Sequence, residues 1–311
     1  MSMACRPRNL KRQGLFSWVR IGWRLFRPLT LTAALVPVLV GTALGAQAQG
    51  TIQVVPFLVF LLCALLIQGA TNMFNEYYDW RRGLDDAQSV GIAGAIVRDG
   101  VPPQVVWWVA WSTVAVAAAL GVWLSHWTGS WLLWVGGLCI LAGWGYTGGP
   151  RPVAYGPLGE LVVAVFMGPV IVGVAYYLQA GTWSPEIWLD SVPVGLLVAA
   201  ILLANNLRDY EQDQARGRKT LAIRLGQPRG QQLLASMLAA SGAVTAGLVC
   251  FGHLPPGALL ALAAAPAGWR SLMAFRRGEG ARGMAWTAKT HLQYGLALVG
   301  GLFLSGFALG R

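Results

Sequence analysis

Long apolar segments recur along almost the whole chain and are separated by short polar stretches. Most reach about 20 residues, the length that crosses the hydrocarbon core of a bilayer as a helix. Because the runs are continuous rather than alternating, they favour helices over a β-barrel. We therefore predict an all-α, polytopic membrane bundle of about nine transmembrane helices, which forms one domain over residues 28–311. The expected spans are 28–48, 52–72, 104–124, 130–147, 159–179, 191–207, 231–251, 255–273 and 291–310.

The composition agrees with this prediction and excludes other classes of protein. Of the 311 residues, 56% are hydrophobic and 11% are charged, whereas about 25% are charged in a typical soluble domain. A soluble globule, a disordered chain and a disulfide scaffold are therefore excluded.

The placement of basic residues predicts the orientation. Lys and Arg number 23 against 12 Asp and Glu, an excess that in a soluble protein would suggest nucleic acid as a partner. If the N-terminus lies in the cytoplasm and the chain crosses nine times, every Lys and Arg except Arg311 falls on the cytoplasmic side. This split follows the positive-inside rule. We therefore expect a location in the cell membrane and a bilayer, not nucleic acid, as the partner of this charge.

The N-terminal segment, residues 1–27, is basic and amphipathic. It has no short apolar region followed by a small-residue cleavage site, so we do not expect a cleavable signal. Its aromatic side chains predict a cytoplasmic segment that lies on the anionic inner leaflet.

Acidic residues are scarce and gather in two clusters, at the cytoplasmic ends of the second and sixth expected spans. The two clusters match at a constant offset of 134 residues. Because the offset contains four helices, both copies enter the same compartment in the same direction, which indicates a parallel internal repeat. The matched pairs are Asn72 with Asn206, Asn75 with Asp209, Asp79 with Asp213, Arg82 with Arg216, and Gly83 with Gly217.

The spacing within each cluster predicts a metal site. Positions i, i+3 and i+7 share one helical face, so each copy presents a polar stripe: Asn72, Asn75 and Asp79, and Asn206, Asp209 and Asp213. Two facing carboxylate stripes repel each other unless a cation lies between them. Oxygen ligands without nearby His or Cys favour Mg²⁺, which normally completes its shell with water and substrate phosphate. The basic residues around the stripes fit a phosphate partner.

These residues resemble the motifs of a known family. Asn75-Glu-Tyr-Tyr-Asp79-Trp-Arg-Arg-Gly83-Leu-Asp85 resembles the first Asp-rich motif of the UbiA superfamily of intramembrane prenyltransferases, and Asn205 to Asp213 with Gly217 to Ala222 resembles the second. A third segment, Tyr146-Thr-Gly-Gly-Pro150 through Glu160, is similar to the branch that prenylates 1,4-dihydroxy-2-naphthoate for menaquinone. The resemblance covers nearly the whole chain and implies a UbiA-like fold.

The resemblance also implies roles for particular residues. The expected catalytic residues are Asp79, Asp209, Asp213 and Tyr146. The expected Mg²⁺ ligands are Asn75, Asp79, Asp85, Asp209 and Asp213. The expected contacts of the diphosphate are Arg208 and Lys219, with Arg82, Arg98 and Arg218 as further candidates. Tyr77, Tyr78 and Tyr146 are candidates to stabilise an allylic cation through their aromatic faces.

The implied reaction is the Mg²⁺-dependent transfer of a polyprenyl group from polyprenyl diphosphate to 1,4-dihydroxy-2-naphthoate, with loss of CO₂ and diphosphate, to give demethylmenaquinone. The acceptor could instead be 4-hydroxybenzoate, haem, chlorophyllide or another quinone precursor. A different class, a cation-coupled transporter, also combines duplicated halves with intramembrane acids, but usually places those acids near the bilayer midplane. The sequence predicts neither the prenyl chain length nor the oligomeric state.

Three features outside the stripes complete the expectations. The family usually has Asp after the first Asn, whereas this chain has Glu76, which lies about 100° round the helix from Asn75. A direct metal contact from Glu76 is therefore less favourable than one from Asp79. The glycine-containing segment from Gly91 to Gly100 is expected to cap the first motif. The histidines, including His291 at the start of the last span, are expected to be solvated or interfacial.

Overall fold

The computed structural model describes residues 15–86, 89, 91 and 93–308, and these residues form helices and connecting loops without a strand. The N-terminal half contains α1 (Leu15–Phe26), α2 (Pro28–Gln49), α3 (Val54–Arg81), α4 (Pro103–Thr128), α5 (Trp131–Thr147) and the 3₁₀ turn η2 (Val153–Tyr155). Next come α6 (Gly159–Val165), the π-helical turn η3 (Phe166–Val170), α7 (Ile171–Ala180), α8 (Ile187–Asp190), α9 (Val192–Arg208), α10 (Tyr210–Ala215) and α11 (Leu221–Leu225). The chain ends with α12 (Gln227–Cys250), the 3₁₀ segment η4 (Pro256–Ala264), α13 (Ala265–Arg276) and α14 (Gly280–Ala308).

Seven helical segments of the described chain are long and apolar enough to cross a membrane: Pro28–Gln49, Val54–Arg81, Pro103–Thr128, Gly159–Ala180, Ile187–Arg208, Gln227–Cys250 and Pro256–Arg276. Each coincides with one of the nine expected spans. The fourth expected span is the shorter α5, and the ninth falls largely within α14. The protein is thus an all-helical, multi-pass membrane bundle, while the count of nine crossings stays a prediction.

One of the spans is continuous in sequence but not uniform in helix type. The segment Gly159–Ala180 passes through α6, the π turn η3 and α7. Pro169 lies inside η3. Because proline has no amide hydrogen and its ring clashes with the preceding turn, a local widening of the helix lets the span continue past it. Such π turns are frequent at functional sites, and η3 contributes to the large cavity described below.

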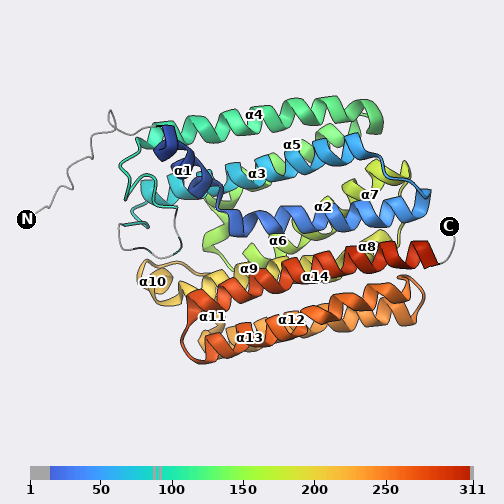
Figure 1. Ribbon diagram of the computed structural model, residues 1–311. Coiled ribbons are helices and arrows are strands. Elements are labelled where there is room, and N and C mark those ends of the chain that lie inside the picture. Colours follow the sequence, from blue (N-terminus) through green and yellow to red (C-terminus); the bar gives the residue numbers. More distant parts are fainter. Residues whose placement is uncertain (1–14, 87–88, 90, 92, 309–311) are drawn as a thin grey trace, which may run out of the picture.

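The long helices lie side by side, and the short helices α10 and α11 gather with the loop after α3 at one end of the bundle (Figure 1). Helix α2 packs against α3, α7 and α14, and α9 packs against α6, α12 and α14. The largest core cluster includes Val36 of α2, Val172 of α7, Val194 of α9 and Leu298 of α14. Large apolar side chains on α4 and α5, such as Trp108 and Trp134, face outward, as expected for helices in contact with lipid.

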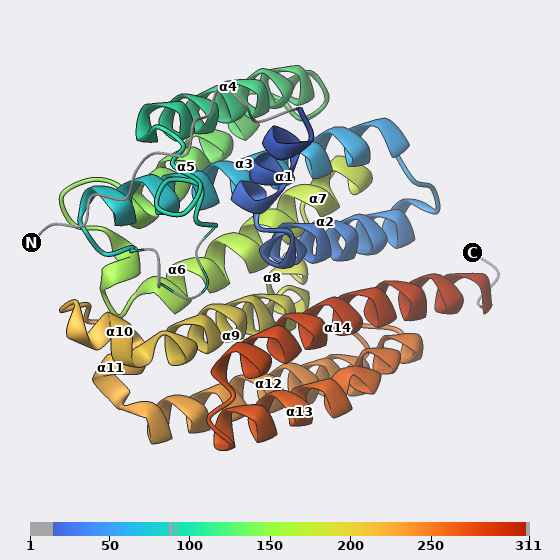
Figure 2. The ribbon, with the colours of Figure 1, turned by 60° about the vertical axis from the view of Figure 1, so that its left-hand side comes forward.

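Helix α1 crosses the bundle near the start of α2 (Figure 2). It buries Ile21 and Leu25 and exposes Phe16, Val19 and Trp23. This two-sided pattern is that of a helix that lies in a membrane interface, so the structure gives the expected amphipathic segment a defined helix over its described part, residues 15–26.

A close approach between η4 and α14 depends on two glycines, and it gives a first prediction. A Cβ atom on Gly301 would lie 1.9 Å from the carbonyl oxygen of Gly257, whereas a Cβ on the adjacent Gly300 would meet nothing within 4 Å. We expect Gly301→Ala to lower the free energy of unfolding by about 1–3 kcal/mol, the usual cost of overpacking.

The matched control is Gly300→Ala, which we expect to be neutral or slightly stabilising because alanine is the better helix former. The measurement is the thermal unfolding midpoint of the purified protein in detergent. Equal midpoints for the two variants would show that the contact between Gly257 and Gly301 does not constrain the packing.

Candidate active site

The two polar stripes meet at one end of the bundle, where they line a single polar pocket of about 100 Å³. Asn75 and Asp79 reach it from α3, Asp209 from the end of α9, and Asp213 from α10. Both motifs therefore lie at the same end of the bundle, which is the arrangement that the parallel repeat predicts. The remaining lining residues are Arg27, Asp85, Ser89, Gly91, Tyr146, Thr147, Ala154, Leu202, Asn205, Asn206, Arg208, Gln212, Arg216 and Arg218.

The internal repeat is visible in the backbone as the same helix ending at both motifs. The amide of Leu84 donates to the carbonyl of Asp79 (2.8 Å), and, 134 residues later, the amide of Arg218 donates to the carbonyl of Asp213 (3.0 Å). Both endings are Schellman motifs, which require a left-handed residue after the helix. Gly83 (φ 68°) and Gly217 (φ 75°) occupy that position, and glycine adopts it without steric cost.

The first member of each stripe has a different partner. Asn72 donates from Nδ2 to the carbonyl of Phe26 and to the hydroxyl of Thr30, and so ties α3 to the junction of α1 and α2. Asn206 donates to Glu160 of α6 at 2.9 Å. Both amides join helices. Asn72 does not line the pocket, whereas Asn206 lines it together with the later members of both stripes.

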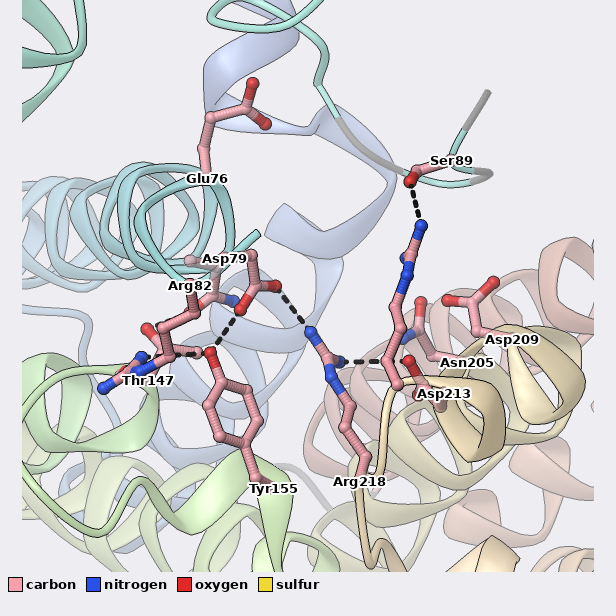
Figure 3. A network of polar contacts seen from close by, with 12 residues as sticks. Glu76, Asp79, Arg82, Ser89, Thr147, Tyr155, Asn205, Asp209, Asp213 and Arg218 are labelled. Atoms are coloured by element: carbon pink, nitrogen blue, oxygen red, sulfur yellow. Dashed lines mark hydrogen bonds and ion pairs between the residues drawn. The ribbon is translucent and has the colours of Figure 1, made fainter. Parts of the chain in front are cut away.

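Two arginines form ion pairs with three of the four carboxylates that line the pocket. Arg208 pairs with the adjacent Asp209 at 2.5 Å. The guanidinium of Arg218 lies between the two stripes, 2.9 Å from Oδ2 of Asp79 and 3.4 Å from Oδ1 of Asp213 (Figure 3). The pair of stripes therefore surrounds a cationic group, as the sequence predicts, but in this structure the cation is an arginine side chain.

Tyr155 organises this arrangement, and sequence reasoning missed it. Its hydroxyl donates to Oδ1 of Asp79 at 2.5 Å. Its ring lies 4.8 Å from the guanidinium of Arg218 and 5.0 Å from that of Arg82. Arg82 also donates to the carbonyls of Thr147 and Gly149. The only sequence signal for Tyr155 is its place in the third family-like segment, between Tyr146 and Glu160.

Burial and mutual repulsion perturb the acidic groups. Burial, together with the nearby carboxylate of Asp79, raises the pKa of Asp85 to about 7. Burial likewise raises the pKa of Asp213 to about 6, with Arg218 opposing and Asp209 adding to the shift. Although burial alone would lower it, the pKa of Arg218 is raised by the carboxylates of Asp79 and Asp213. The pocket therefore favours an added positive charge.

The donor set fits a hard divalent cation. All candidate ligands supply oxygen, which Mg²⁺ prefers, and Oδ2 of Asp85 is buried without a hydrogen-bond partner. Among the residues that the structure describes, no three acidic or histidine side chains already converge on one point. Binding a metal between the stripes therefore requires the side chains to rearrange around the position of Arg218.

A large, mostly apolar cavity of about 540 Å³ adjoins the polar pocket. Its walls come from α2, α3, α4, α5, the segment α6–η3–α7 and α9. The residues that line both spaces are Arg27, Asn75, Tyr146, Leu202 and Asn205. The site can therefore accept a molecule with an anionic head and a long apolar tail, with Tyr146 where the two parts join.

Several expected site residues lie elsewhere. Arg98 donates to the carbonyl of Ser89 and lines neither space, and the side chain of Lys219 is exposed. Tyr77 and Tyr78 pack in an aromatic cluster with Trp107 rather than against the pocket. Their expected roles as substrate contacts find no support in this geometry.

Two further differences have clear physical causes. His291, expected at the interface, is fully buried in α14, because that helix begins eleven residues before it, at Gly280. Arg27, not anticipated as a site residue, has a positive φ of 50° between α1 and α2. The helical region is disfavoured before a proline, and Pro28 follows Arg27, so the chain turns there and brings Arg27 to both spaces.

Glu76 supports the loop instead of the pocket. Its carboxylate accepts from the amides of Gly94 and Ile96, both at 3.3 Å, and lies 3.6 Å from Arg27. Figure 3 shows the side chain directed away from Asp79. Helical geometry thus correctly places Glu76 off the stripe, and the loop it holds contributes Gly91 to the pocket wall.

This contact gives a second prediction. Glu76→Gln should accelerate amide hydrogen exchange at Gly94 and Ile96, because an amide is a weaker acceptor than a carboxylate. We expect the free energy of unfolding to fall by about 1–3 kcal/mol, because buried polar groups then lose part of their hydrogen bonding. The affinity for Mg²⁺ should not change. A loss of Mg²⁺ binding as large as that of Asp79→Asn would instead identify Glu76 as a ligand.

The chain is similar in sequence and in fold to known proteins. Residues 34–307 match the UbiA prenyltransferase family. The 1,4-dihydroxy-2-naphthoate octaprenyltransferase of Bacillus subtilis (strain 168) is 40% identical over 93% of this chain and 94% of that protein. The apo structure of a UbiA homologue from Aeropyrum pernix K1 has a TM-score of 0.68 at 16% identity, over 87% of this chain and 96% of that one. A UbiA homologue from Archaeoglobus fulgidus bound to GPP and Mg²⁺ has a TM-score of 0.57 at 16% identity, over 90% and 99% of the two chains.

Proposed function

The chain belongs to the UbiA prenyltransferase family, and from this premise we propose that it transfers a polyprenyl group from polyprenyl diphosphate to 1,4-dihydroxy-2-naphthoate. The transfer depends on Mg²⁺ and releases CO₂ and diphosphate, so that the immediate product is the reduced, naphthalenediol form of demethylmenaquinone. Membership of a prenyltransferase family removes the alternative of a cation-coupled transporter. The relative from Bacillus subtilis, which carries the name of this activity, supports the choice of acceptor.

The observation that carries the proposal is the continuity of the polar pocket with the apolar cavity. An allylic diphosphate needs both environments at once: charge-neutralising groups for its head and an apolar channel for its tail. The two spaces share Asn75, Tyr146 and Asn205, so the bond between head and tail would lie among these residues. A soluble enzyme would have to bury the tail completely, whereas a membrane bundle can extend its cavity toward lipid.

The proposed metal site consists of Asn75, Asp79, Asp85, Asp209 and Asp213, all of which line the polar pocket. When bound there, Mg²⁺ would neutralise the diphosphate and make it a better leaving group. The UbiA homologue from Archaeoglobus fulgidus that is bound to GPP and Mg²⁺ supports the choice of Mg²⁺ as the metal. Arg208 and Arg218 are the proposed diphosphate contacts within the pocket, because a guanidinium matches phosphate oxygens bidentately.

The remaining steps are bond changes within the two substrates, and the apolar walls of the cavity surround them. The bond between the allylic carbon and the diphosphate oxygen breaks, and its electron pair leaves with the diphosphate. The acceptor ring then forms a carbon–carbon bond to the allylic carbon and loses its carboxylate as CO₂, which returns an electron pair to the ring. The apolar cavity excludes water from the allylic cation. Tyr146, whose ring borders both spaces, is proposed to stabilise that cation.

The proposed location is the cell membrane, with the polar pocket at the cytoplasmic face. The support is the distribution of Lys and Arg along the chain, which places both acidic motifs in cytoplasmic segments. A water-soluble aromatic acid and Mg²⁺ would then reach the pocket from the cytoplasm, while the polyprenyl tail stays in the bilayer.

The test is an incubation of the purified protein with a labelled polyprenyl diphosphate and a panel of acceptors, followed by mass analysis of the products. The panel contains 1,4-dihydroxy-2-naphthoate, 4-hydroxybenzoate, haem and a chlorophyllide. We expect the dominant product to have the mass of the prenylated naphthalenediol without its carboxylate. A dominant product from another acceptor would move the chain to a different branch of the family, and absence of any transfer would contradict the proposal.

A further inference from the structure

Arg218 occupies the position between the two acidic stripes. Its Nη2 lies 2.9 Å from Asp79 and its Nη1 lies 3.4 Å from Asp213. These carboxylates are equivalent members of the internal repeat, one on α3 and one on α10. The guanidinium thus bridges the two halves of the chain at the point where their negative charges face each other (Figure 3).

Backbone geometry fixes the base of this arginine and leaves its tip less constrained. The amide of Arg218 is the last donor of the second Schellman motif, bonded to the carbonyl of Asp213. The matching residue of the first motif is Leu84, so the repeat supplies one bridging arginine for two carboxylates. The guanidinium rests against the ring of Tyr155 at 4.8 Å, and its Nε is buried without a hydrogen-bond partner.

The bridge and a metal compete for the same oxygens. Mg²⁺ binds at about 2.0–2.1 Å in near-octahedral geometry, which a guanidinium held between the same two carboxylates does not permit. A buried carboxylate pair without any counterion is strongly destabilised. One cation must therefore replace the other as the site is loaded.

We propose that Arg218 is an exchangeable counterion of the active site, which holds Asp79 and Asp213 together before substrate binds and moves to the diphosphate when Mg²⁺ takes its place. The inference rests on the proposed function for the identity of the metal and of the anion. Arginine is suited to both states, because its planar fork pairs with carboxylate and with phosphate. Tyr155 provides a surface over which the guanidinium can turn without losing its aromatic contact.

The exchange makes the affinity of the site for Mg²⁺ depend on whether a diphosphate binds with the metal. Mg²⁺ alone must displace Arg218 without giving it a new partner, so the free metal binds weakly. Mg²⁺ that arrives with a diphosphate supplies both a replacement counterion and a new anion for the arginine. The site thereby favours the complete metal–diphosphate substrate over the free metal.

The first test measures binding of Mg²⁺ alone to the EDTA-treated, full-length protein in detergent by calorimetric titration. Removing the competing cation in Arg218→Gln should tighten Mg²⁺ binding about tenfold, within the roughly 5–150-fold range of coupled binding sites. The matched control is Arg216→Gln, since Arg216 also lines the pocket but pairs with Asp86 at 3.2 Å and touches neither bridged carboxylate. The Arg216→Gln substitution should raise the affinity for Mg²⁺ clearly less than Arg218→Gln does. Equal effects of the two variants, or weaker Mg²⁺ binding in Arg218→Gln, would overturn the proposal.

The second test measures binding of inorganic pyrophosphate at saturating Mg²⁺. We expect weaker binding in Arg218→Gln and partial recovery in Arg218→Lys, which keeps the charge but cannot bridge two carboxylates through a planar fork. Pyrophosphate affinity that is unchanged in Arg218→Gln would show that the arginine stays on the carboxylates and would refute the exchange.

The thermal unfolding midpoint completes the experiment and checks that the variants fold. Without Mg²⁺, Arg218→Gln should melt below the wild type, and saturating Mg²⁺ should close the gap, because either cation can neutralise the pair. A purely structural ion pair would leave a gap that Mg²⁺ does not close. If wild-type protein binds no Mg²⁺ even with pyrophosphate, the proposed metal function itself fails, an outcome distinct from failure of the exchange.

Discussion

Replacing Asp79 or Asp213 by Asn is expected to lower the rate of prenyl transfer about 10²–10³-fold, the loss typical of removing one preorganised electrostatic contact at a reacting centre. Each carboxylate lines the polar pocket, and each belongs to one half of the internal repeat. Because a metal between the stripes needs ligands from both, the two single variants should have similar defects. The measurement is the initial rate of product formation by purified protein in detergent.

The matched control is Glu211→Gln. Glu211 lies on α10 between Asp209 and Asp213, but its side chain is exposed and does not line the pocket. It should retain wild-type activity, while all three variants should elute as folded protein in size-exclusion chromatography. Near-normal turnover by either Asp79→Asn or Asp213→Asn would refute the metal role assigned to that residue.

Removal of divalent metal is expected to have the largest effect. A bound metal contributes several kcal/mol of charge stabilisation, and a loss of that size is at least about 10³-fold in rate, since about 1.4 kcal/mol corresponds to a factor of ten. Membranes treated with EDTA should therefore form no measurable product, and excess Mg²⁺ should restore the wild-type rate.

The same treatment tests whether the metal acts at the proposed site. Excess Mg²⁺ should restore activity to membranes with the wild-type protein but not to membranes with Asp79→Asn. Product formation that continues unchanged in EDTA would contradict the mechanism, whatever the behaviour of the variants.

The spans and the stripes could be predicted from sequence because both depend on local periodicity. A helix that crosses a bilayer needs about 20 consecutive, mostly apolar residues. Residues three and seven positions apart on a helix share a face. The repeat could be detected for the same reason, and the Schellman endings at Gly83 and Gly217 agree with it at the level of backbone hydrogen bonds.

The partners of individual side chains could not be predicted, because they depend on contacts between distant segments. Asn72 lies on the stripe but bonds to Phe26. Tyr155 reaches Asp79 across a sequence separation of 76 residues. Arg218 looked like one of several cationic neighbours, and only the folded chain shows that it lies between both carboxylates.

Residues close to a motif in sequence can also be directed away from it. Arg98 and Lys219 flank the acidic segments, yet the first bonds to Ser89 within its own loop and the second is exposed. Basic residues near a motif therefore indicate that the site attracts an anion. The local backbone determines whether each of their side chains reaches the site.

The central claim is that residues of both halves of the chain bind one divalent ion together with the diphosphate. The most direct measurement is electron paramagnetic resonance of Mn²⁺, used in place of Mg²⁺, bound with inorganic pyrophosphate to the wild-type protein, Asp79→Asn and Asp213→Asn. The account predicts a protein-bound Mn²⁺ with phosphorus hyperfine coupling in the wild type and loss of that signal in both variants. An undiminished signal in either variant would show that one stripe alone holds the metal and would contradict the account.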